Sequence, residues 1–153
     1  MAPITIEAAT EAEREWCAQL MARSDPWITL GRDVAQCRAR CGNPEDLLLV
    51  AHAGPEPCGF ILIDLRGVAG SPYVATIAVA EHARGQGVGT LMLAHAESLF
   101  AGRARYIFLC VSSFNVHARR LYERLGYSLV GEFKDYVIDG ASELLMHKRL
   151  VRS

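Results

Sequence analysis

The sequence predicts one α/β (α+β) domain in which helices cover a mixed β-sheet. Three observations predict this class: a length of 153 residues, a hydrophobic content of 51%, and apolar runs of strand length that alternate with helical patterns. The length fits a single domain over residues 1–153. The composition is that of a packed globular protein rather than a disordered one.

The elements can be justified in chain order. Thr10 followed by Glu13 predicts a capping box at the start of the first helix, and Pro26 ends that region because proline disfavours helical geometry in the preceding residue. Apolar runs rich in β-branched residues predict strands, and Gly126 predicts the end of the last helix. The expected helices cover residues 10–23, 30–41, 87–100 and 115–125. The expected strands cover residues 3–9, 47–53, 58–65, 73–80, 106–111, 127–137 and 142–150.

Composition and charge exclude several classes of protein. Sixteen basic and seventeen acidic residues give a net charge of −1, which argues against a nucleic-acid binder that relies on bulk positive charge. No window approaches the roughly 20 apolar residues of a membrane helix, and the N-terminal residues do not resemble a signal peptide.

The five cysteines are odd in number and form no Cys-x-x-Cys pair, so a reduced, cytoplasmic protein with free thiols is expected. Cys37 and Cys41 lie one helical turn apart. Two ligands do not make a metal site, so no metal is expected.

A glycine-rich segment after the strand at residues 73–80 carries the clearest chemical signal. It opens the next helix with a turn that exposes backbone N–H groups, where the helix dipole adds positive charge. Glycine lets the backbone approach an anion closely, and Arg84 adds a full charge. The segment predicts recognition of a phosphate or pyrophosphate, although a glycine-rich turn alone is weak evidence. Its residues are Arg84, Gly85, Gln86, Gly87, Val88, Gly89 and Thr90.

Two motifs resemble the GCN5-related N-acetyltransferase (GNAT) superfamily. The first is Arg84-x-x-Gly87-x-Gly89, and the second runs from Asn115 through Leu121-Tyr122 to Leu125-Gly126-Tyr127. Within that superfamily, the sequence is similar to bacterial ribosomal-protein-alanine N-acetyltransferases. The resemblance implies a mostly antiparallel sheet of six to seven strands flanked by about four helices. It also implies an acyltransferase that moves an acetyl group from acetyl-CoA to a primary amine by direct attack in a ternary complex.

The resemblance also implies roles for individual residues. The backbone from Ile77 through Ala78 to Val79 would bind the pantetheine arm where the strand bulges and splays, and the amides of residues 84–90 would hold the pyrophosphate. Asn115 would contact the coenzyme arm, although a helix N-cap explains it equally well. Tyr122 would act as general acid toward the leaving thiolate, with a packed aromatic residue as the alternative.

The expected acceptor side is less well defined. Trp27 and Tyr136 would line it by analogy, and a core position is equally plausible for each. Cys110 stands where the alanine N-acetyltransferases have a glutamate base, and packing explains a cysteine on a buried strand better than a covalent role does. Candidate replacement bases are Glu132, Asp135, Glu143 and His117, each of which also reads as a solvated surface group.

The missing glutamate favours an acceptor that is easy to deprotonate. At neutral pH a neutral lysine costs about 4–5 kcal/mol, whereas a neutral α-amine costs about 1.4 kcal/mol. An N-terminal α-amine of a protein or peptide, or a small amine, is therefore expected. Two alternatives stay open: a non-catalytic acyl-CoA-binding or sensor module, and an acetyltransferase for a polyamine, an amino acid or an aminoglycoside. Members of the superfamily often form homodimers, but no stretch of this sequence identifies an interface.

Overall fold

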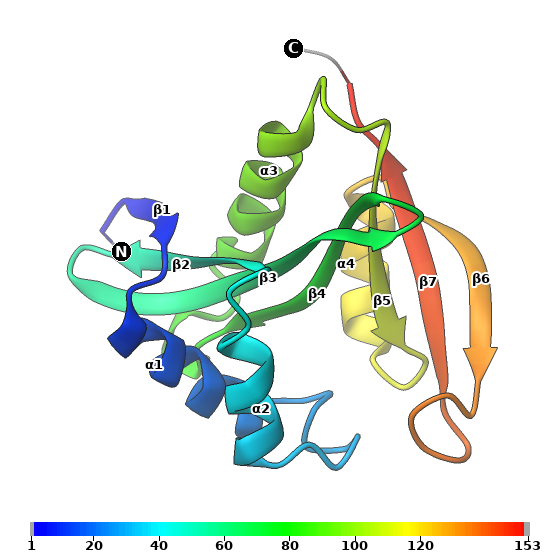
Figure 1. Cartoon of the computed structure of the whole chain (residues 1–153), viewed down its shortest axis with the longest axis horizontal. Helices are drawn as coiled ribbons and strands as arrows, with labels where there is room; N and C mark the ends of the chain where they lie inside the picture. The colour runs from blue at the N-terminus through cyan, green and yellow to red at the C-terminus, as the bar shows by residue number, and fades with distance from the viewer. Residues whose placement is uncertain (1, 152–153) are drawn as a thin grey trace.

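The structure, a computed structural model, describes residues 2–151 and contains one twisted seven-stranded sheet in that range (Figure 1). The strand order is β1-β2-β3-β4-β5-β7-β6. Only β4 and β5 run parallel, and the other neighbouring pairs are antiparallel. The strands are β1 (Ile4–Ala8), β2 (Leu47–Ala53), β3 (Glu56–Val68), β4 (Ser71–Val79), β5 (Tyr106–Ser112), β6 (Ser128–Lys134) and β7 (Ser142–Arg149).

Helices cover both faces of this sheet, as Figure 1 shows. On one face, α1 and α2 pack with Phe60 and Leu62 of β3 in one apolar cluster. On the other, α3 and α4 pack with Ile61 and Ile63 of the same strand. The alternation along β3 produces the two cores because successive side chains of a strand point to opposite faces. In the described range the α-helices are α1 (Glu11–Ala22), α2 (Val34–Cys41), α3 (Val88–Phe100) and α4 (Val116–Arg124), with a short 3₁₀ turn at Glu81–Ala83.

The sequence-based order of helices and strands is correct, and the predicted fold class is confirmed. The clearest error is the start of the second helix, which was expected at residue 30 and begins at Val34. The Asp33 side chain caps this helix by accepting a hydrogen bond from the Gln36 backbone N–H. The Gln36 side chain in turn accepts a hydrogen bond from the Asp33 backbone N–H. Residues 25–31 form turns instead, with Gly31 at a φ of 76°. The third strand is also longer than expected, since β3 extends from Glu56 to Val68.

A β-bulge at Ala75 reverses which side chains of β4 point to each face of the sheet. Leu62 of β3 lies opposite Thr76 and Ile63 lies opposite Val74, so Ala75 is left without a partner on β3. An extra residue inverts the alternation of side chains beyond it. As a result Tyr73, before the bulge, and Thr76, after it, line the same cavity on the α1/α2 face.

Candidate active site

The site begins where β4 and β5 separate. These parallel strands pair only at Tyr73–Phe108 and Val74–Leu109, and they diverge beyond those positions. The part of β4 from Ala75 onward is therefore open on the β5 side. A strand edge of this kind offers unpaired backbone N–H and C=O groups to a ligand.

The hydrogen-bond pattern of β4 tells which groups face the opening. The Ala80 N–H donates to the Cys58 carbonyl at 2.8 Å, on the β3 side. Since N–H groups alternate in direction along an antiparallel strand, those of Ile77 and Val79 face away from β3. The expected pair of pantetheine-binding residues therefore presents its backbone to the gap, while Ala78 bonds toward β3.

A chain of backbone amides follows at the end of this strand. Gly87 is the N-cap of α3, has a φ of 80°, and gives no side-chain cap, so the first N–H groups of the helix have no partner within it. Gly85 has a φ of 74°, which lets the loop turn tightly ahead of the helix. Within residues 2–151, the amides from Gly85 to Thr90 donate no backbone hydrogen bond outside helices and strands. Free amides at a helix N-terminus are the geometry that an anion cradle needs, and the binding of an anion by these residues stays a prediction.

Arg84 fixes the loop to the open edge of β4. Its Nε donates to the Val79 carbonyl at 3.1 Å, and its side chain is otherwise exposed. The guanidinium lines a cavity of about 300 Å³ together with Ile77, Val79 and Trp27, which we call the loop cavity. This cavity lies between Arg84 and the open edge of β4.

A second cavity of about 170 Å³ fills the gap itself, and we call it the inter-strand cavity. Tyr122 of α4 lines it from the α3/α4 face, together with Asn115. The Asn115 side chain accepts a bond from the Ala118 N–H at 3.3 Å, so it caps α4 and lines the cavity at once. Burial raises the pKa of Tyr122 to about 12, and its hydroxyl donates to no group in the described range.

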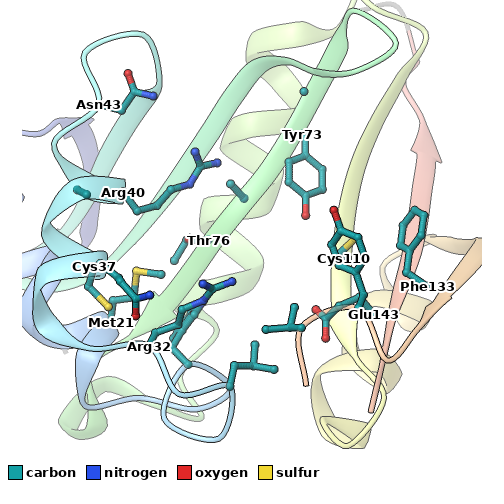
Figure 2. A pocket seen from close by; sticks show the side chains of 18 of the residues that line it. Met21, Arg32, Cys37, Arg40, Asn43, Tyr73, Thr76, Cys110, Phe133 and Glu143 are labelled. Atoms are coloured by element: carbon teal, nitrogen blue, oxygen red, sulfur yellow. The ribbon is translucent and has the colours of Figure 1, made fainter. Parts of the chain in front are cut away.

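A third and larger cavity, of about 730 Å³, lies between α2, β4 and the β6–β7 hairpin, and we call it the large cavity (Figure 2). Trp27 lines it as well as the two smaller cavities, so all three meet at this side chain. Tyr136 lines only the large cavity, with its ring 5.3 Å from that of Phe133. The sequence analysis predicted that Trp27 and Tyr136 line the acceptor side of the site, and both line this cavity.

Tyr73, Cys110 and Glu143 lie where the large and inter-strand cavities meet. Figure 2 shows the Tyr73 hydroxyl directed toward Cys110, with the Glu143 carboxylate below both in this view. Burial raises the pKa of the Cys110 thiol, with the Tyr73 hydroxyl opposing that effect and the charge of Glu143 adding to it. Burial also raises the pKa of Tyr73. Both groups therefore stay protonated at neutral pH, so neither is suited to accept a proton from an amine.

The structure separates the four candidate replacement bases. Glu143 lines the cavities and accepts a 2.7 Å bond from Ser112 Oγ. Glu132 instead accepts from Ser142 Oγ, Asp135 accepts from the Gly140 N–H, and His117 is exposed on α4. Among these four, Glu143 alone lines the large cavity.

Sequence reasoning missed Tyr73, Arg32 and Arg40, which also line the large cavity. The position of Tyr73 depends on the bulge at Ala75, which no local pattern marks. Arg32 could have been noticed, because it directly precedes the Asp33 cap of α2.

Metal clusters and membrane-spanning helices are both absent from the described residues. Residues 2–151 hold no cluster of three or more His, Cys, Asp or Glu side chains placed to bind a metal ion. In the same range, every helix is too short or too polar to span a bilayer.

Comparison with known proteins identifies the family. The sequence profile of the acetyltransferase (GNAT) family matches residues 8–127. The chain belongs to this family. The predicted family and the predicted acyltransferase activity are thereby confirmed.

Among GNAT relatives, the N-alpha-acetyltransferase RimI of Mycobacterium tuberculosis is 30% identical over 156 residues, which cover 95% of this chain and 92% of that protein. An uncharacterized N-acetyltransferase of Methanocaldococcus jannaschii is 37% identical over 82 residues, 52% of this chain and 53% of that protein. That second match spans about half of the archaeal protein.

Solved structures share the fold. The ribosomal-protein-S18-alanine N-acetyltransferase from Escherichia coli has a TM-score of 0.77 at 17% identity, covering 99% of this chain and 96% of its own. An aminoglycoside 6'-N-acetyltransferase complexed with coenzyme A has a TM-score of 0.78 at 18% identity, covering 97% of this chain and 98% of its own. At these identities the likeness concerns the fold alone.

Proposed function

We propose that residues 1–153 work as one acetyltransferase domain that moves an acetyl group from acetyl-CoA to an α-amine, by direct attack in a ternary complex. One observation carries this proposal. The open edge of β4 lies between a cavity lined by Glu143 and a helix that brings Tyr122 to the same gap. A base for the amine and a donor for the leaving sulfur thus lie at one opening in the sheet.

Acetyl-CoA fits the residues present. The amides of residues 85–90 and the Arg84 guanidinium would hold the pyrophosphate, because a helix N-terminus with free N–H groups favours anions. The N–H groups of Ile77 and Val79 would bind the pantetheine arm and orient the thioester carbonyl. Asn115 would contact the same arm from the start of α4.

Glu143 would take the place of the base that the alanine N-acetyltransferases have at the position of Cys110. Its carboxylate lies beside Cys110 and is oriented by the Ser112 hydroxyl. Glu143 accepts the proton that the amine loses as nitrogen attacks the thioester carbon, directly or through one water. Because burial keeps the Cys110 thiol protonated, this thiol is a poor nucleophile. The amine nitrogen would therefore attack the thioester directly, without an acyl-cysteine intermediate.

Tyr122 would stabilise the departing thiolate. Its pKa of about 12 lies well above the value of about 8.5 for a thiol, so full proton transfer to sulfur is unfavourable. A protonated phenol in a buried site instead donates a strong hydrogen bond to the negative charge that develops on sulfur. The carbonyl double bond reforms as the carbon–sulfur bond breaks and the electron pair leaves with sulfur.

An α-amine suits this arrangement better than a lysine does. A single carboxylate at the mouth of a cavity must receive a proton from an amine that is mostly protonated at neutral pH. That cost is about 1.4 kcal/mol for an α-amine and about 4–5 kcal/mol for a lysine. The 30% identity to a protein named as an N-alpha-acetyltransferase supports the same choice.

The test is thiol release from acetyl-CoA with four classes of amine at pH 7: peptides with a free N-terminus, N-terminally blocked peptides with one lysine, polyamines and aminoglycosides. Varying both substrates gives intersecting double-reciprocal lines for a ternary complex and parallel lines for a covalent intermediate. We expect turnover with the free N-terminus and intersecting lines. Turnover with only a polyamine or an aminoglycoside would contradict the α-amine as acceptor. Parallel lines would contradict direct attack in a ternary complex.

A further inference from the structure

The charged residues that line the large cavity have an uneven distribution. In the described range they are Arg32 and Arg40 on the α2 side and Glu143 on the β7 side. Figure 2 shows the two guanidinium groups extending into the space that faces Tyr73 and Glu143. The cavity therefore has a positive wall opposite a negative one.

The positive wall depends mainly on Arg32. Arg40 lies 3.2 Å from the Asp46 carboxylate, which neutralises part of its charge, whereas Arg32 makes no ion pair with any residue in the range 2–151. Arg32 is exposed and is held in place by its backbone, whose N–H donates to the Trp27 carbonyl at 2.9 Å.

The coenzyme does not account for this charge. Arg84, the first residue of the loop that would hold the pyrophosphate, lines the loop cavity, and neither Arg32 nor Arg40 lines that cavity. Conversely, the residues of the glycine-rich loop do not line the large cavity. The anion that Arg32 is placed to meet therefore belongs to the acceptor.

We propose that the acceptor carries a carboxylate as well as an amine, with the amine at Glu143 and the carboxylate at Arg32. This inference rests on the proposed function for the identity of the amine site. An amine with a second, negative group satisfies both walls, because an arginine fork matches a carboxylate. A polycation would leave Arg32 facing like charge, which disfavours polyamines and aminoglycosides. The carboxylate can come from an acidic side chain near a protein N-terminus or from the end of a free amino acid or dipeptide.

The test measures binding, which separates it from turnover. Three C-terminally amidated, fluorescently labelled peptides begin with Ala and continue with two Glu, two Gln or two Arg. Their dissociation constants are measured by anisotropy with the protein saturated with coenzyme A. We expect the acidic peptide to bind about tenfold more tightly than the neutral one, and the basic peptide to bind most weakly.

Substitutions at Arg32 test whether this residue causes the preference for the acidic peptide. Arg32→Gln is expected to remove the advantage of the acidic peptide, Arg32→Glu to reverse the order, and Arg32→Lys to retain most of it. Arg38→Gln is the matched control, because Arg38 lies on α2, close to Arg32 in sequence, but pairs with Glu15 and does not line the cavity. Competition by the dipeptide Ala-Glu, compared with its diamide, tells whether the small-molecule carboxylate is also bound through Arg32.

Equal binding of the acidic and basic peptides, or an equal effect of Arg32→Gln on all three, would overturn the inference. Acetyl transfer to the neutral peptide is measured in parallel and tests the proposed function by itself. Arg32-dependent binding without any transfer would therefore contradict the proposed function and leave the present inference standing.

Discussion

Ser112 Oγ donates a 2.7 Å hydrogen bond to the Glu143 carboxylate, across the register in which β5 and β7 place these residues opposite each other. The bond directs a carboxylate toward the gap between β4 and β5. A base can therefore occupy this site although the strand that precedes α4 carries Cys110 in place of glutamate.

Replacing Glu143 tests this base. Glu143→Gln keeps the shape and the bond to Ser112 but removes the negative charge, so kcat with a peptide α-amine should fall about 100-fold at pH 7. The loss should shrink toward pH 9, where the free amine is already neutral. Glu132→Gln, on the same hairpin but outside the cavities, is the control and should keep its rate. An unchanged rate in Glu143→Gln would exclude this residue as the base.

Tyr122→Phe tests the donor to sulfur. The substitution removes one hydroxyl from a buried position and should lower kcat about tenfold or more, with little change in the KM for acetyl-CoA. Because burial raises its pKa to about 12, the native hydroxyl stays protonated and the rate should show no alkaline decline below about pH 10. A kcat that matches the native value, under conditions where chemistry limits turnover, would contradict the role.

Gly87→Ala tests the anion cradle. A side chain at a φ of 80° is strained by about 1–2 kcal/mol, so the loop should adopt another path and the Kd for acetyl-CoA should rise about tenfold. Gly131→Ala serves as the control, since a methyl group there meets open space and the backbone is not left-handed. Calorimetric titration measures both. Equal affinity in the two variants would show that the loop does not hold the coenzyme.

Cys110→Ala tests direct transfer. With its thiol held protonated by burial, Cys110 is a poor nucleophile, and activity should remain within about threefold of the native rate. Intact-mass spectrometry of native protein mixed with acetyl-CoA should reveal no acetyl adduct. An adduct that disappears in Cys110→Ala together with activity would favour the covalent route.

Glu13 gives the fold a pH dependence that is independent of activity. The Thr10 backbone N–H, and then His52, lower the pKa of Glu13, so the ionised carboxylate stabilises the folded state. That contribution is present above the ordinary pKa of glutamate and is lost as pH falls through the lowered folded value. Glu13→Gln should cost about 1 kcal/mol at pH 7 and less at pH 3, measured by urea unfolding. A cost for Glu13→Gln that grows at low pH would contradict the assignment.

The sequence allowed most of the fold to be predicted because its signals are local. Strand β2 runs from Leu47 to Ala53, as its apolar run predicts, and the capping box of Thr10 and Glu13 is present at the start of α1. The start of α2 was misplaced because apolar Leu30 was counted as helical. The decisive signal was the second capping box, Asp33 with Gln36.

Site residues could be predicted from the sequence only where they lie in one contiguous segment. The loop from Arg84 to Thr90 is contiguous, so its cradle could be expected from the glycine spacing. By contrast, Tyr73 and Glu143 come together through the bulge at Ala75 and the pairing of β7 with β5. Both depend on sheet register, which one sequence does not encode locally, so Glu143 stayed one of four candidates.

The most direct measurement uses one peptide that has a free N-terminal alanine and a single internal lysine. After incubation with the protein and acetyl-CoA at pH 7, tandem mass spectrometry locates the added acetyl group. The account predicts acetylation of the α-amine at least tenfold above that of the lysine, and loss of both in Glu143→Gln. Acetylation mainly on lysine, or no transfer by protein that binds acetyl-CoA, would contradict it.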